Sequence, residues 1–120
     1  LRLSMTYHDV LITLKQMRDY AQEAVSMAAG RTRQDLDTDR MFNLAMTRLL
    51  EIVGEAARRV PEETRAEHPH IAWAQIVGIR NRIVHGYDLI NLDVVWDVVT
   101  HDIPVLASQV NEIIDRLDRG

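Results

Sequence analysis

The stretch DRMFNLAMTRLLEIVGEAARRV, residues 39–60, has the periodicity of one long amphipathic helix. Its apolar residues recur at steps of three and four, which places them on a single broad face. The members of this face are Phe42, Ala45, Met46, Leu49, Leu50, Val53, Ala56, Ala57 and Val60. Pro61 ends the helix, and Asp37 or Thr38 is expected to cap its start. The stretch therefore predicts a long helix that packs against the rest of the fold by one face.

The segments on either side also show helical signals. Before the stretch, residues from about Thr6 to Ala29 carry an apolar stripe at helical spacing, and Gly30 is a fitting C-terminal stop. The polar run RTRQDLDTDR, residues 31–40, predicts a loop between the two helices. After the stretch, the proline and acidic residues that open PEETRAEHPH, residues 61–70, predict a short helix.

Two further helices are expected in the C-terminal half. The third begins near Ile71 and extends to about His85, where Gly86 ends it. The last is capped by Asn91 and continues to about Leu117 with a regular apolar face.

These segments together predict the fold class. No alternation typical of strands is present, so we expect an all-α fold, an antiparallel bundle of about four long helices. Pro104 removes one backbone donor inside the last helix and is expected to bend it. The length fits one domain over residues 1–120.

The composition narrows the classes of function. The chain has no cysteine, which excludes disulfides, thiolate metal sites and cysteine nucleophiles and makes a reducing cytoplasm the expected location. No apolar run is long enough to span a membrane. The net charge of −4 is unsuited to coating nucleic acid by bulk electrostatics, but it is compatible with a local basic cleft.

A polar cluster stands in the third helical segment: RNRIVHGY, residues 80–87, contains Arg80, Asn81, His85 and Tyr87. On a helix, Asn81 and His85 share a face because they are four apart. Histidine transfers protons near neutral pH, and arginine binds phosphate and stabilises the charge that grows on it. Asn81 is suited to orient the imidazole or a substrate oxygen. These residue types fit cleavage of RNA without a metal, in which a base activates the 2′-hydroxyl.

A purely structural interpretation of the same cluster is also open. Cationic Arg80 and His85 near a helix C-terminus complement the helix dipole, and Tyr87 can make an ordinary capping contact. Spacing alone does not decide between the two interpretations.

Beyond spacing, the cluster resembles a known family. RNRIVHGY fits the R-N-x-x-x-H-x-Y pattern of HEPN domains and is similar to the HepT toxin subfamily in particular. LLEIVGEAARRV, residues 49–60, resembles the second helix of that family, and HPHIAWAQIVGIRNRIVHGY, residues 68–87, resembles its connector and third helix. VVWDVVTHDIPVL, residues 94–106, resembles its last helix. The likeness covers nearly the whole chain in the family's order.

The resemblance implies a homodimeric helical bundle and a metal-independent endoribonuclease toxin that uses no cofactor. It implies that Arg80 and His85 of both subunits are the catalytic residues in one cleft, with RNA as substrate and Asn81 in support. It also implies a partner, a minimal nucleotidyltransferase antitoxin encoded by an adjacent gene. In that family the antitoxin attaches adenylate to the motif tyrosine, here Tyr87, and silences the toxin.

Two carboxylates on the second helix offer further candidates. Glu51 and Glu55 are four apart, a spacing that is weak evidence for acid–base work. Glu55 is expected to pair with Arg58 or Arg59, one helical turn further on. The alternative is that Glu55 supports the site by orienting Arg80, since a buried arginine needs a carboxylate.

Other residues carry weaker signals. Gly54 inside the second helix costs about 1 kcal/mol relative to alanine, which indicates close approach of another helix or a dimer contact. The histidines of residues 68–70 are expected in a turn rather than in a metal site, because the sequence offers no third ligand at helical spacing. Trp73 and Trp96 are expected to anchor the core or an interface.

Three functions compete at this point. The first is the ribonuclease toxin. The second is a non-catalytic HEPN module that binds nucleotide or protein, which the intact Arg80, Asn81, His85 and Tyr87 disfavour. The third is a purely structural helical dimer, which would not require a histidine at position 85.

Overall fold

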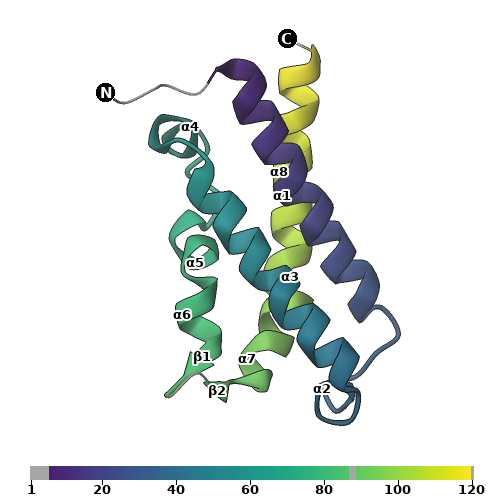
Figure 1. Cartoon of the computed structure of the whole chain (residues 1–120). Coiled ribbons are helices and arrows are strands. Elements are labelled where there is room, and N and C mark those ends of the chain that lie inside the picture. Colours follow the sequence, from purple (N-terminus) through teal and green to yellow (C-terminus); the bar gives the residue numbers. More distant parts are fainter. Residues whose placement is uncertain (1–5, 87–88, 120) are drawn as a thin grey trace.

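The computed structural model describes residues 6–86 and 89–119. Its long helices α1 (Tyr7–Ala28), α3 (Arg40–Arg59) and α8 (Ile103–Arg119) lie alongside one another (Figure 1). α1 packs against both α3 and α8. The structure is mostly helical, which confirms the expected all-α class.

The first helix begins and ends as its sequence predicts. Thr6 caps α1 by accepting a hydrogen bond from the Asp9 backbone N–H at 3.1 Å, and the Asp9 carboxylate accepts one from the Thr6 N–H at 3.2 Å. This reciprocal capping box satisfies two backbone donors that the first turn leaves without a partner. Past the end of the helix, Gly30 has a φ of 74°, the left-handed conformation that suits glycine.

The start of α3 differs from the prediction by one residue. Asp39 is the cap, because its carboxylate accepts a hydrogen bond from the Phe42 N–H at 3.1 Å. The expected caps, Asp37 and Thr38, are wrong because they lie inside α2 (Asp35–Thr38), a short helix in the predicted loop. A hydrogen bond from Arg31 and the Phe42 N–H hold the pKa of the Asp39 carboxyl below its ordinary value.

The connector after α3 contains the expected short helix, α4 (Glu62–Glu67), followed by a turn at residues 68–70. The predicted third helix beyond it is wrong as a single element. α5 (Trp73–Val77) stops at Gly78, whose φ of −86° and ψ of 11° leave the helical region, and α6 (Ile79–Ile83) follows directly.

A small hairpin replaces the last turn of the expected third helix. β1 (Val84–His85) pairs antiparallel with β2 (Leu89–Ile90), in the register Val84 opposite Ile90. Gly86 has a φ of 65° and turns the chain, as predicted. Strands of two residues are too short to show the alternation that indicates a strand in a sequence, and the all-α class is unchanged.

The last helical path is continuous to Arg119, but it is not α-helical throughout. The side chain of Asn91 caps α7 (Leu92–Asp97), as predicted. Between α7 and α8 lies the π-helical segment η1 (Val98–Asp102). η1 ends just before Pro104, which has no N–H to donate to the helix.

The core lies where α1, α3 and α8 meet and extends to the face of α3 that α5 and α6 cover. The largest fully buried side chains are Leu14, Met17, Leu36, Met46, Leu50, Val53, Ile79, Ile83, Ile103, Leu106, Ile113 and Ile114. The predicted apolar face of the second helix is buried in the structure, except for the half-buried Ala45. Within the described residues, no helix is long and apolar enough to cross a membrane.

Candidate functional site

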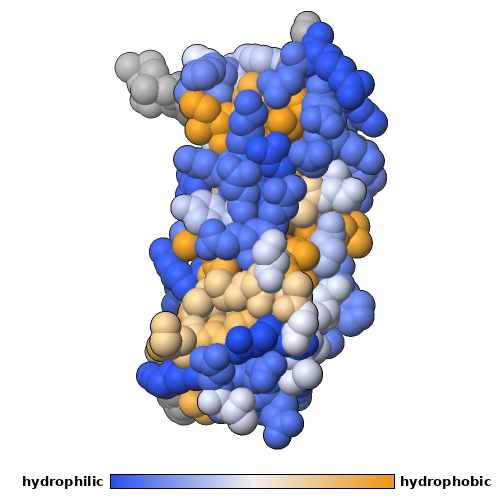
Figure 2. Space-filling model, turned by 90° about the vertical axis from the view of Figure 1, so that its right-hand side faces the viewer, coloured by the Kyte–Doolittle hydropathy of each residue, from blue (hydrophilic) through white to orange (hydrophobic). Residues whose placement is uncertain are grey.

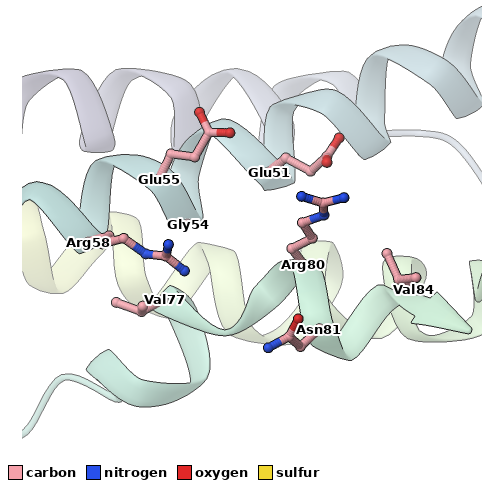
Figure 3. Close-up of a pocket in the computed structure, with 8 residues that line it drawn as sticks. All are labelled: Glu51, Gly54, Glu55, Arg58, Val77, Arg80, Asn81 and Val84. Atoms are coloured by element: carbon pink, nitrogen blue, oxygen red, sulfur yellow. The ribbon is translucent and has the colours of Figure 1, made fainter. Parts of the chain in front are cut away.

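A pocket of about 360 Å³ lies between α3 and the segment formed by α5, α6 and β1 (Figure 3). Its lining residues are Glu51, Gly54, Glu55 and Arg58 of α3, Val77 of α5, Arg80 and Asn81 of α6, and Val84 of β1. The pocket thus joins the middle and end of the second long helix to the polar cluster that the sequence singles out. Three predicted site residues, Arg80, Asn81 and Glu55, contribute to its walls.

Gly54 is what lets the two walls approach one another. A Cβ at this position would lie 3.0 Å from the Ile76 carbonyl oxygen, 3.6 Å from the Ile79 Cβ and 3.7 Å from the Val77 carbonyl oxygen. A contact of 3.0 Å to backbone cannot be relieved by rotating a side chain. The prediction that Gly54 marks a close helix contact is therefore confirmed, and the contact sets the position of α5 and α6 against α3.

Gly54→Val is expected to lower the free energy of unfolding by about 1–3 kcal/mol, the usual cost of overpacking. The added carbons meet the backbone at Ile76, so α5 must move away from α3. Chemical denaturation measures the change as a lower midpoint at constant slope. Gly54→Ala is the matched control. It adds only the Cβ and gains about 1 kcal/mol of helix propensity, so its loss is smaller. Equal stability of the valine variant and the parent would contradict the close contact.

Arg80 and Asn81 occupy the α6 wall with exposed side chains. Figure 3 shows the Arg80 side chain rising from α6 toward α3, with its guanidinium below Glu51 in the view. Within the described residues, 6–86 and 89–119, no side chain makes an ion pair or a hydrogen bond with the side chains of Arg80 or Asn81. A guanidinium without such a partner in a pocket is available to an anion.

Glu55 lines the pocket but pairs outside it. Its Oε1 lies 3.4 Å from Nη1 of Arg48, two turns earlier on α3. The expected partner, Arg58 or Arg59, is therefore wrong. The reason is rotamer choice, because an exposed glutamate reaches either end of its helix and the sequence does not fix which. Figure 3 shows the Glu55 carboxylate directed away from Arg80, and a supporting role for Glu55 stays a prediction.

His85 lies beside the pocket rather than on its helical wall. It is exposed in β1, opposite Leu89, and directly follows Val84, which lines the pocket. The inference that Asn81 and His85 share a helical face is wrong, because α6 ends at Ile83 and the chain is extended from Val84. Tyr87, the predicted modification site, lies outside the described residues.

Comparison with known proteins now decides the family. The model of the family described as ribonuclease HepT-like matches residues 17–113 of the chain. The chain belongs to the HepT-like ribonuclease family. This membership confirms the resemblance found in the motifs, and it places the chain among enzymes of the ribonuclease class.

Named relatives of this HepT-like chain agree with that assignment. It is 33% identical over 92 residues to the protein named "Putative RNase TTE0752" of Caldanaerobacter subterraneus subsp. tengcongensis. This match covers 77% of this chain and 82% of the relative. It is 30% identical over 103 residues to the protein named "Probable ribonuclease HepT" of Thermococcus cleftensis, which covers 80% and 94%. No solved structure shows a comparable match.

The HepT-like motif segment is anchored by a contact that its sequence does not reveal. Nη1 of Arg82 donates a hydrogen bond to Oδ2 of Asp102 at 2.6 Å, and both side chains are half-buried. The backbone N–H of Asn91 also donates to the Ile83 carbonyl oxygen, at 2.6 Å. These contacts connect α6 to η1 and to the residue that caps α7. They fix the position of α6, the helix that carries Arg80 and Asn81 in the pocket wall.

The two tryptophans and the histidines of residues 68–70 do not line the pocket. Trp73 is buried, and its indole N–H donates to the His68 carbonyl oxygen at 3.0 Å, which fixes the turn at residues 68–70 onto α5. Trp96 is half-buried against the core. Burial lowers the pKa of His68. The described residues contain no group of three or more His, Asp or Glu side chains placed to hold a metal ion.

Proposed function

We propose that this HepT-like chain is the toxin of a toxin–antitoxin pair, and that in the cytoplasm it cleaves RNA internally without a metal ion, in a cleft between two subunits. The observation that carries the proposal is the pocket into which Arg80 projects beside Asn81 (Figure 3). His85 lies on the strand that continues the same wall. Membership of the HepT-like ribonuclease family supports RNA cleavage as the reaction at this pocket.

In the proposed reaction, His85 accepts the proton of a 2′-hydroxyl while the 2′-oxygen attacks the adjacent phosphorus. The bond from phosphorus to the 5′-oxygen of the next nucleotide breaks, a 2′,3′-cyclic phosphate remains, and the leaving oxygen takes a proton from an imidazolium. Arg80 donates hydrogen bonds to the non-bridging oxygens and stabilises the charge that develops on them. Asn81, which is next to Arg80 in the wall, binds a substrate oxygen.

A second copy of the chain is part of the proposal because α3 leaves apolar side chains in solvent. Met41 is 82% exposed and Leu44 is 53% exposed, both in the N-terminal half of α3. On a helix they share a face with Arg48, Glu51 and the rest of the α3 pocket wall. Figure 2 shows a further apolar band, across the lower half of the side of the molecule that is on the right in Figure 1. Because Met41 and Leu44 lie on the helix face that lines the pocket, their exposed apolar surface supports an interface next to it.

The partner that silences the enzyme is, in this proposal, a minimal nucleotidyltransferase antitoxin encoded by an adjacent gene. Its target is Tyr87, which follows the positive-φ turn at Gly86, two residues beyond His85. Adenylation there would bring an anionic phosphate close in sequence to the catalytic residues.

The test is cleavage of single-stranded RNA by purified protein in the presence of a chelator. We expect light scattering to give the mass of two chains and gel analysis to show cleavage that the chelator does not stop. Cleavage by a protein of monomer mass would remove the shared cleft from the proposal. Cleavage that requires added magnesium would overturn the mechanism, and RNA binding without cleavage would favour the non-catalytic HEPN module.

A further inference from the structure

A second arginine faces the pocket from its other end. Arg58 belongs to the last turn of α3, and its guanidinium extends over the pocket on the side of Val77 (Figure 3). Arg80 enters from α6, further along the same opening. Gly54 lines the pocket together with them and presents no side chain. The two guanidinium groups therefore border one opening, and the backbone of α5 occupies the place of a side chain at Gly54.

The carboxylates of the pocket do not neutralise these two arginines. In the chain from residue 6 to 86 and from 89 to 119, neither Arg58 nor Arg80 is in an ion pair. Glu55, the carboxylate nearest to Arg58 in sequence, is paired with Arg48 instead. The pocket thus presents two exposed guanidinium groups with Glu51 as the remaining unpaired carboxylate.

Arg58 could have a purely structural role, which differs from a role in binding an anion in the pocket. A cation in the last turn of a helix stabilises the helix through its dipole. Arg59 occupies the same last turn and is also exposed, but it does not line the pocket. A dipole effect acts on both residues alike, whereas a role in the pocket belongs to Arg58 alone.

We propose that Arg58 binds a phosphate of the RNA backbone next to the phosphate held by Arg80. This rests on the proposed function, in which Arg80 holds the scissile phosphate. A guanidinium binds phosphate through paired N–H donors, so two such groups along one opening offer two phosphate sites to a single strand. Arg58 is then a positioning residue that sets the register of the strand.

The experiment measures binding of a fluorescent single-stranded 2′-O-methyl RNA, which lacks the nucleophile for cleavage, by anisotropy over a range of salt concentrations. Arg58→Ala is expected to weaken binding roughly tenfold, as for the loss of a charge-assisted hydrogen bond. It is also expected to reduce the slope of log affinity against log salt by about 0.7, one phosphate contact on a single strand. Arg59→Ala, which removes the same charge from the neighbouring position, is expected to change the slope by much less.

The outcomes separate this proposal from the proposed function. If Arg58→Ala and Arg59→Ala weaken binding equally, Arg58 is not a phosphate site, even where the parent protein cleaves ordinary RNA. If the parent does not cleave but the slope still depends on Arg58 alone, the phosphate site stands and the nuclease mechanism falls. Thermal unfolding checks that each variant is folded, and Arg58→Gln replaces the alanine variant if that one does not fold.

Discussion

His85→Ala is expected to lower the rate of RNA cleavage by about 10²- to 10⁴-fold, the usual contribution of a general acid–base residue. The imidazole is exposed on a two-residue strand, so its removal takes little from the core. Circular dichroism should therefore show unchanged helical content, and the loss should appear in single-turnover cleavage rather than in stability. His8→Ala is the matched control, since His8 is also exposed but lies in the first turn of α1.

The assignment to His85 fails if His85→Ala and His8→Ala cleave RNA at the same rate. It also fails if RNA binding falls as much as cleavage does, because a proton-transfer residue affects the chemical step more than ground-state binding. In the same assay, Arg80→Ala separates the two roles. Its loss should be seen in both quantities, because a guanidinium on the phosphate contributes to binding and to transition-state stabilisation.

The parts of the fold that were predictable from sequence are those in which one periodic pattern dominates. The apolar face of residues 39–60 became α3, with its core side buried. Asn91 caps the helix that follows it, because a side-chain oxygen at that position satisfies a backbone N–H of the first turn. In each of these cases local chemistry and tertiary packing favour the same conformation.

The third helix shows where that agreement ends. Gly78 is the only glycine or proline in residues 71–85, and its cost of about 1 kcal/mol in a helix is too small to predict a break there. The break follows from tertiary contacts: Gly54 lets α5 approach α3, and the bond from the Asn91 N–H to the Ile83 carbonyl oxygen closes the hairpin behind α6. Such contacts join residues far apart in sequence, which periodicity does not record.

The same distinction holds for the candidate site. Arg80, Asn81 and His85 were found because they fall within one short motif. The sequence offers Arg58 only as an expected partner of Glu55, because its place in the pocket depends on the packing of α3 against α6. The pair of Arg82 and Asp102 has no local signal, because its members are twenty residues apart and on different elements.

Tyr87→Phe is expected to leave RNA cleavage largely intact and to abolish silencing by the partner. The hydroxyl is the only group lost, and the proposed proton transfer does not use it. In the parent protein, adenylate on that hydroxyl would add an anionic phosphate seven residues from Arg80 in sequence, and we expect this phosphate to compete with the RNA backbone for the guanidinium. A phenylalanine has no oxygen to accept the adenylate, so the variant toxin should stay active in the partner's presence.

Co-expression with the neighbouring nucleotidyltransferase, followed by intact-mass analysis and a growth assay, measures both parts of this prediction. The parent chain should gain whole adenylate units and lose toxicity, and Tyr87→Phe should gain none and stay toxic. Tyr20→Phe is the matched control, because Tyr20 is a tyrosine on the exposed side of α1 and should be without effect. Neutralisation of the parent with no change in mass would mean that inhibition comes from binding alone. Equal modification of the Tyr87→Phe variant would move the switch to another residue. In either case the proposed roles of Arg80 and His85 are untouched, because they depend on cleavage by the unmodified protein.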